Sequence, residues 1–239
     1  MPSPVRPAAA KTRKRPASPQ AEREQLTRAV IARAALRIID EQGLGSLSMR
    51  ALGASLGVEA MALYHHFPSK GQLLDAVVDL LALEIDLPAR DRVLPLVRLR
   101  RAIRSYRRIA LTHPQAFSLL AARRFNSDTA FAVYERILEG FADIGLDAAD
   151  SARWFRLLGG FAGGAGMAYV AGLEQGPDAT PLRLERDPGR IAHPHVAAVA
   201  PHLRLANLDG VFEYGLDVLF EALAQHTQAA AATSRQRRR

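Results

Sequence analysis

Residues 43–70, GLGSLSMRALGASLGVEAMALYHHFPSK, contain the pattern that decides the fold of this chain. Ser48 suits the N-cap of a short helix, and Gly57 follows the last residue of the apolar pattern, as a C-cap does. A second short helix follows this turn, with Leu63 as its inward anchor, and Pro68 ends it. Two short helices joined by a glycine-containing turn form a helix-turn-helix, whose second helix can enter the major groove of DNA. The stretch therefore predicts sequence-specific DNA binding.

The rest of the chain has helical periodicity, and no segment keeps the alternation of a β-strand. Further helices are expected over residues 26–41, 69–86, 92–112, 114–124, 128–144, 147–173 and 208–226. Residues 174–195 are rich in proline and scattered charges, which is typical of a long connector. The sequence therefore predicts an all-α protein in which a three-helix N-terminal domain precedes a larger helical domain.

Several motifs at defined spacing together indicate one protein family. They are Leu56-Gly57-Val58 in the turn, the Leu63-Tyr64 pair, and Phe67-Pro68-Ser69-Lys70 leading into Leu73-Leu74. With these motifs, residues 27–78 resemble the DNA-binding head of the TetR-type one-component repressors, and the whole layout is similar to that of the tetracycline repressors. The resemblance implies a C-terminal ligand-binding and dimerisation domain, whose last two long helices, here 148–173 and 208–226, form a four-helix bundle with a second copy. A twofold homodimer in turn implies a palindromic operator in double-stranded DNA.

In the resembled family, a small molecule bound in the second domain moves the connecting helix, so that the two heads no longer fit successive major grooves. We therefore expect a ligand-responsive repressor that an unknown effector releases from its operator by a shift in population between two dimer forms. Large residues on inward stripes are the candidate ligand contacts, although core packing would explain them equally well: Tyr106, Phe117, Leu120, Tyr134, Ile137 and Phe161. The polar and histidine contacts of the tetracycline repressors are not reproduced, so we expect an effector other than tetracycline.

The candidate DNA contacts lie in and around the helix-turn-helix: Ser48, Met49, Arg50, Ala60, Met61, Ala62, Tyr64, His65, His66 and Lys70. The start of the second helix, residues 60–62, reads Ala-Met-Ala, which can contact thymine methyl groups but forms no bidentate hydrogen bonds. Arg50 is therefore the best candidate for guanine N7 and O6, with an ion pair inside the protein as the alternative role. One of the two histidines is expected to face the groove and the other to pack on the first helix.

The net charge of +8 is concentrated at the two ends of the chain. Residues 1–20 and 229–239 together carry nine lysines and arginines and no acid, so the rest of the chain is close to neutral. We therefore divide the chain into a disordered basic arm at 1–22, a helix-turn-helix domain at 23–70, an effector-binding and dimerisation domain at 71–228, and a disordered basic tail at 229–239. The arm could lie along DNA phosphates or only aid solubility. The alternative function is a sequence-indifferent nucleoid-associated protein that acts through these ends.

Several other classes of protein and site are not expected from this sequence. The absence of cysteine excludes disulfides and thiolate chemistry, and no Ser-His-acid arrangement with a recognisable context occurs, so we expect neither enzymatic activity nor a cofactor. His193, His195 and His202 lack the spacing and the partners of a zinc site, so no metal is expected. The basic N-terminus has no apolar stretch like that of a signal peptide, which favours a cytoplasmic protein without a membrane partner.

Two further segments leave alternatives open. The glycine-rich segment 159–166, GGFAGGAG, lacks the preceding strand of a dinucleotide-binding fingerprint. Residues 155–173 carry one charge, but their six glycines and four alanines make them barely hydrophobic, which argues against a membrane span. We favour a helix that packs closely on its neighbours.

Six arginines lie within residues 98–108. We favour the interpretation that they form a solvated helix face, and an anion-binding surface is the alternative.

Overall fold

The computed structural model describes residues 26–122, 127–175, 193–203 and 205–237. Its α-helices are α1 (Arg28–Gln42), α2 (Met49–Leu56), α3 (Ala60–His66), α4 (Lys70–Leu83), α5 (Pro95–Thr112), α6 (Pro114–Ala122), α7 (Asp128–Asp143), α8 (Ala148–Gln175), α9 (Pro194–Val199) and α10 (Leu208–Arg237). Short 3-10 turns cover Leu44–Ser46, Ala200–His202 and Leu205–Asn207. No strand occurs in the described ranges, and the predicted all-α fold is confirmed.

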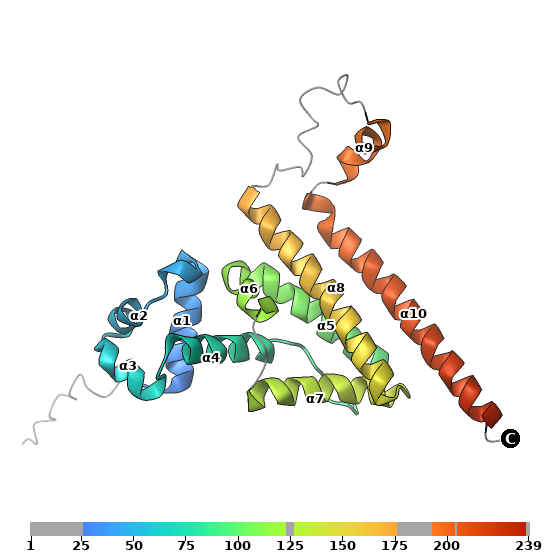
Figure 1. Cartoon of the computed structure of the whole chain (residues 1–239), viewed down its shortest axis with the longest axis horizontal. Coiled ribbons are helices and arrows are strands. Elements are labelled where there is room, and N and C mark those ends of the chain that lie inside the picture. Colours follow the sequence, from blue (N-terminus) through green and yellow to red (C-terminus); the bar gives the residue numbers. More distant parts are fainter. Residues whose placement is uncertain (1–25, 123–126, 176–192, 204, 238–239) are drawn as a thin grey trace, which may run out of the picture.

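Helices α1 to α4 form the N-terminal head at one end of the elongated molecule (Figure 1). The side chain of Thr27 caps α1, and Ser48 Oγ caps α2 by accepting a backbone hydrogen bond at 3.1 Å. Gly57 ends α2 with a φ of 66°, a left-handed conformation that glycine adopts without steric cost. A Cβ at Gly53 would lie 2.7 Å from the carbonyl oxygen of Val58, so the tight turn between the two helices requires glycine there. The predicted helix-turn-helix is confirmed.

The second domain is built around α5, which packs against α7 and α8 (Figure 1). Apolar side chains of α5, α7, α8 and α10 close over one core that includes Leu99, Phe141, Leu158 and Leu216. Full burial of each such side chain contributes about 1.5–3 kcal/mol, so this core holds the four helices together. Helices α8 and α10 lie side by side at the edge of the molecule opposite the head.

The head and the second domain meet around the end of α4. Ile85, just after α4, and Tyr106 on α5 each pack against the apolar cores of both domains. His113, between α5 and α6, bridges two carboxylates: its Nδ1 lies 2.8 Å from Asp40 Oδ2 in α1, and its Nε2 lies 3.0 Å from Glu84 Oε1. Because a carboxylate only accepts hydrogen bonds, both ring nitrogens donate when the imidazole is protonated. The domains are thus joined by apolar packing and by a polar bridge.

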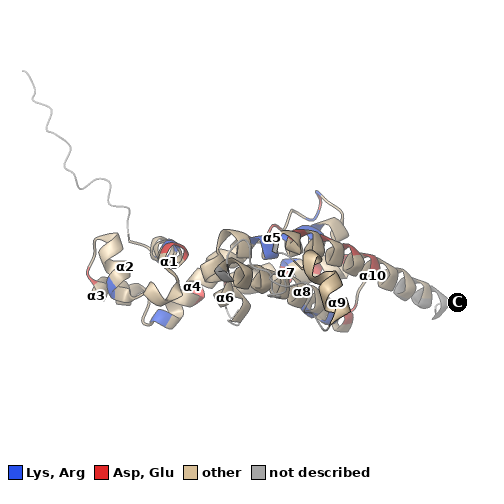
Figure 2. Ribbon diagram, turned by 90° about the horizontal axis from the view of Figure 1, so that it is seen from above, with Lys and Arg blue, Asp and Glu red and all other residues tan. Residues whose placement is uncertain are grey.

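Arginines of α5 form a row of ion pairs with acidic residues of α10. The pairs are Arg100 with Asp217, Arg104 with Glu213, and Arg107 with Asp209. Figure 2 shows the basic residues of α5 beside the acidic residues of α10. The expectation of a solvated face was wrong for Arg98 and Arg107, which are 3% and 7% exposed, because neighbouring helices cover them. Since α10 supplies the partners of three of these arginines, they hold α10 against α5 and are not an open anion-binding surface.

Some helix ends differ from the boundaries expected from the sequence. Helix α4 ends at Leu83, slightly earlier than expected, and α10 continues to Arg237, through residues where we expected a disordered tail. Residues 229–232 are all alanine, which has the highest helix propensity of any residue and therefore favours continuation of the helix. The basic arm at 1–22 and most of the connector at 174–195 lie outside the described residues. None of the described helices is both long and apolar enough to span a membrane.

Candidate DNA-binding head and effector pocket

The recognition helix α3 has one buried side and one exposed side. Leu63 is fully buried in the head, whereas Met61 is 69% exposed and Tyr64 is 42% exposed. His65 is exposed as well, and His66 is half-buried with its carbonyl oxygen accepting a hydrogen bond from Arg28 of α1. Met61, Tyr64 and His65 are therefore accessible to a DNA groove. Because only the backbone of His66 is shown in contact with α1, the expected division between the two histidines stays a prediction.

Arg50 lies in the first turn of α2 with an exposed side chain. Among the residues that the structure describes, no acidic side chain pairs with it, so the alternative role in an ion pair has no support there. Its guanidinium carries five donors and is free to form the bidentate contact that guanine or a phosphate offers.

Other predicted DNA contacts have structural roles. Met49 is 7% exposed and belongs to the core of the head, so the prediction that it contacts DNA is wrong; the first turn of α2 directs this side chain inward. The hydroxyl of Ser48 is occupied as the cap of α2. Lys70 is exposed, but its Nζ donates to the carbonyl oxygen of Leu47 at 2.5 Å, which anchors the start of α4 to the loop before α2. Ala60 packs on the core of the head, and like residue 62 it is half-buried.

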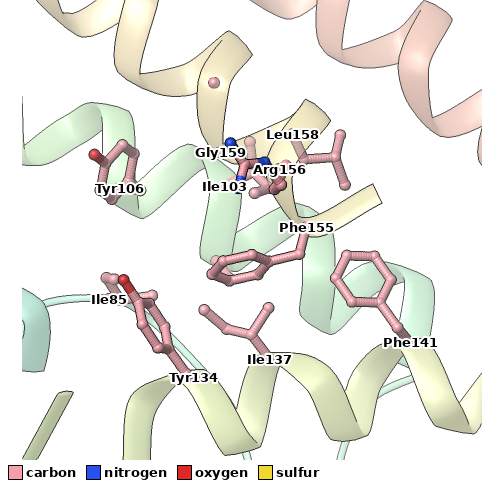
Figure 3. Close-up of a pocket in the computed structure, with 12 residues that line it drawn as sticks. Ile85, Ile103, Tyr106, Tyr134, Ile137, Phe141, Phe155, Arg156, Leu158 and Gly159 are labelled. Carbon is pink, nitrogen blue, oxygen red and sulfur yellow. The ribbon is translucent and has the colours of Figure 1, made fainter. Parts of the chain in front are cut away.

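A cavity of about 270 Å³ lies between α5, α7 and α8 (Figure 3). Its lining residues are Ile85, Ala102, Ile103, Tyr106, Tyr134, Ile137, Phe141, Phe155, Arg156, Leu158, Gly159 and Gly160. Figure 3 shows Tyr134 and Ile137 of α7 projecting towards Phe155 of α8, with Ile85 beside Tyr134. An engineered cavity of about 150 Å³ binds benzene, so this larger space has room for a small organic molecule.

Three of the six predicted ligand contacts line this cavity, namely Tyr106, Tyr134 and Ile137. Phe117 and Leu120 instead belong to the core shared with the head. There the ring of Phe117 contacts that of Tyr106, with ring centroids 5.7 Å apart. Phe161 stacks on Phe212 of α10, with ring centroids 5.3 Å apart. The prediction that these three line the pocket was wrong, because an inward-facing stripe does not reveal which neighbouring helix it meets.

The polar groups of the cavity wall are two phenols and one guanidinium. Burial raises the pKa of Tyr106 above its ordinary value. Burial, together with the neighbouring Tyr106, raises the pKa of Tyr134 to about 12. Both phenols are therefore protonated at neutral pH and can donate hydrogen bonds. Arg156, exposed on α8, contributes the positive charge.

The sequence contained a partial signal for the α8 side of this wall. The glycine-rich segment that begins with Gly159 and Gly160 predicts close packing between helices. That interpretation holds for Gly166, where a Cβ would lie 2.5 Å from two ring carbons of Phe117. Close packing is not found at Gly159 or Gly160, because a Cβ at either position would meet no described atom within 4 Å. These two glycines border the cavity instead.

Gly166→Ala and Gly159→Ala are expected to change the stability of the protein in opposite directions. The Phe117 ring beside Gly166 is fully buried, so overpacking should lower the free energy of unfolding by about 1–3 kcal/mol. At Gly159 the methyl group enters open space, and the better helix propensity of alanine should raise it by about 0.5–1 kcal/mol. Urea unfolding of both variants measures the two changes. A Gly166→Ala protein as stable as the wild type would contradict the close contact between α8 and α6.

The fold and these sites define a class of protein. A helix-turn-helix head with an exposed recognition helix, joined by α4 to a helical domain that contains an apolar cavity, is a DNA-binding transcriptional regulator. The model of the tetR family of bacterial regulatory proteins matches residues 31–77, and that of the tetracycline repressor-like C-terminal domain matches residues 96–227. The chain belongs to the TetR family of bacterial transcriptional regulators.

Individual relatives agree with this assignment. An HTH-type transcriptional regulator of Saccharopolyspora erythraea is 30% identical over 142 residues, which are 57% of this chain and 58% of that protein. The match therefore spans less than two thirds of that relative's length. A possible TetR family regulator from Streptomyces coelicolor is 27% identical with a TM-score of 0.71, covering 82% of this chain and 98% of the other. ActR from Streptomyces coelicolor, in complex with actinorhodin, is 25% identical with a TM-score of 0.66, covering 84% and 98%.

Proposed function

We propose that this protein is a ligand-responsive repressor that binds a palindromic operator as a homodimer and is released from it by a small-molecule effector. The observation that carries the proposal is the position of Ile85. This residue lines the cavity, follows α4 directly, and packs against the cores of both domains. A molecule in the cavity therefore contacts the segment that sets the position of the DNA-binding head. Such a regulator acts in the cytoplasm, on double-stranded DNA.

The outward faces of α8 and α10 support a dimer. They expose large apolar side chains, namely Leu157, Met167, Leu173, Val211, Tyr214 and Val218. On the same face of α8, Gly164 has no described atom within 4 Å of an added Cβ, which leaves room for a second helix to approach. Exposed apolar surface of this kind marks an interface, and a second copy of the same two helices would cover it by twofold symmetry.

The release mechanism follows from the connection through α4. Helix α4 contributes Leu73 and Val77 to the core of the head, so the head moves with this helix. The position of Ile85 changes with that of α4, and hence with the distance between the two heads of the dimer. An effector that binds better to one position of Ile85 therefore favours the dimer form with the corresponding distance between the heads. It shifts the equilibrium only by its difference in affinity for the two forms. The similar TetR family protein ActR has been solved in complex with actinorhodin, which supports a ligand site in this protein.

Selection of bound fragments from a random duplex library, at about 150 mM salt, tests the proposal. A palindrome should be enriched. Arg50→Ala should then weaken binding to that operator by about 1–3 kcal/mol per half-site, because the bidentate contact to guanine is lost. Arg37→Ala, which removes the same charge from an exposed position on α1, is the matched control and should have a much smaller effect.

One outcome would remove the role assigned to Arg50, and a second would overturn the proposal. Equal operator affinities of the Arg50→Ala and wild-type proteins would exclude the assigned base contact. An absence of any enriched palindrome, together with binding that weakens steeply with salt, would favour the sequence-indifferent protein acting through its basic ends.

A further inference from the structure

We infer that the effector is a planar aromatic anion of about two fused rings, whose ring system lies against Gly159 and whose acidic group is bound by Arg156. The inference rests on the proposed function, in which the cavity between α5, α7 and α8 is the effector site. Three independent features of this wall carry it: a gap in the packing, an unpaired cation and an aromatic lining.

The gap in the packing is at Gly159. Glycine within a helix lowers stability by about 1 kcal/mol relative to alanine, so a glycine there needs a reason. Gly140, Gly166 and Gly215 each have one, because a Cβ would lie 2.8 Å or less from a neighbouring side chain. At Gly159 a Cβ would meet no described atom within 4 Å, and this residue lines the cavity. The missing side chain thus leaves a flat helix surface against which a ring can lie.

The unpaired cation is Arg156, which lies one residue after Phe155 and lines the same cavity. Arg153, one turn earlier on α8, pairs with Asp150, and Arg100, Arg104 and Arg107 of α5 pair with acidic residues of α10. For Arg156, by contrast, the described part of the chain offers no acidic partner. The lining residues include no aspartate or glutamate, so the cavity favours an anion over a cation. A guanidinium binds a carboxylate, phenolate or sulfonate through two parallel hydrogen bonds.

The aromatic lining consists of Tyr106, Tyr134, Phe141 and Phe155. Tyr134 and Phe155 meet edge to face, with ring centroids 5.1 Å apart and an interplanar angle of 84°. Aromatic walls of this kind favour offset-stacked and edge-to-face contacts with a flat ring system. The cavity of about 270 Å³ is nearly twice the ~150 Å³ that holds one benzene ring, which sets the size of the ligand.

Anilinonaphthalene sulfonate tests the inference, because it combines two fused aromatic rings with a sulfonate and its fluorescence rises on binding. Phenylnaphthylamine has the same rings without the sulfonate. Arg156→Gln should weaken binding of the sulfonate about tenfold, the loss expected for a charge-assisted contact, and should change the affinity for the neutral amine by less than about twofold. Gly159→Leu should weaken both probes by about tenfold or more, because its side chain fills the cavity. Arg153→Gln is the matched control and should alter neither affinity.

Equal effects of Arg156→Gln on the two probes would overturn the role of the charge, and full binding of both probes by Gly159→Leu would overturn the site. Melting curves establish that each variant is folded, and Gly159→Ala replaces the leucine variant if that protein does not fold.

Operator selection with the wild-type protein separates this inference from the proposed function. A protein that selects an operator but binds neither probe refutes the ligand class alone. A protein that binds the sulfonate through Arg156 but selects no operator refutes the proposed function alone.

Discussion

Leu63→Ala should remove operator binding and lower the free energy of unfolding by about 3 kcal/mol. Leu63 is the only residue of α3 that the structure shows as buried, and its side chain has no exposed surface. A helix of seven residues is too short to persist in water without tertiary packing. Truncating this side chain therefore leaves a cavity in the head and detaches the recognition helix from it.

Urea unfolding and operator titration of the same preparation measure both effects. Met61→Ala is the matched control, because residue 61 lies on the same helix but is 69% exposed. Its stability should stay within about 0.5 kcal/mol of the wild type. If Leu63→Ala kept wild-type affinity for the operator, α3 would not be the element that reads DNA.

The double substitution Tyr214→Asp and Val218→Asp should convert the protein to a monomer and weaken operator binding by about a hundredfold or more. The two side chains are 71% and 48% exposed and lie one turn apart on the outward face of α10. In the proposed dimer this face is covered, and a buried carboxylate without a partner costs several kcal/mol. Without a dimer, each head binds its half-site alone.

Light scattering after size-exclusion chromatography measures the mass, and operator titration measures the affinity. Ala132→Asp places the same charge on an exposed position of α7, outside the proposed interface, and should leave the protein dimeric. A double variant that remains a dimer would show that α8 and α10 do not form the contact.

Much of the head could be predicted because its signals are local. Ser48, Gly57 and Pro68 act on the backbone of their own and adjacent residues, so capping and termination are visible in the sequence. The buried position of Leu63 follows from the same short-range periodicity. Met49 shows the limit of this reasoning, because its neighbours in sequence suggested a DNA contact while the packing of α2 directs it into the core.

The pocket could be predicted only in part. The inward-facing stripes correctly indicated Tyr106, Tyr134 and Ile137. The same criterion also selected Phe117, which packs against Tyr106, and Phe161, which stacks on Phe212. The pairing of the α5 arginines with α10 was not predicted for a similar reason, since the partners are about a hundred residues apart in the chain.

The helical fold, the helix-turn-helix and its family follow from the amino-acid sequence, because helix periodicity, caps and turns depend on residues a few positions apart. The packing of the helices was needed to show that Arg156 has no acidic partner among the described residues, while Arg107 is buried and paired with α10. It was also needed to show that Gly159 borders a cavity, while Gly166 is packed against Phe117. Residues of one type have the same local preferences in a helix. Their roles differ because each faces a different neighbour, and which neighbour that is depends on how distant helices pack.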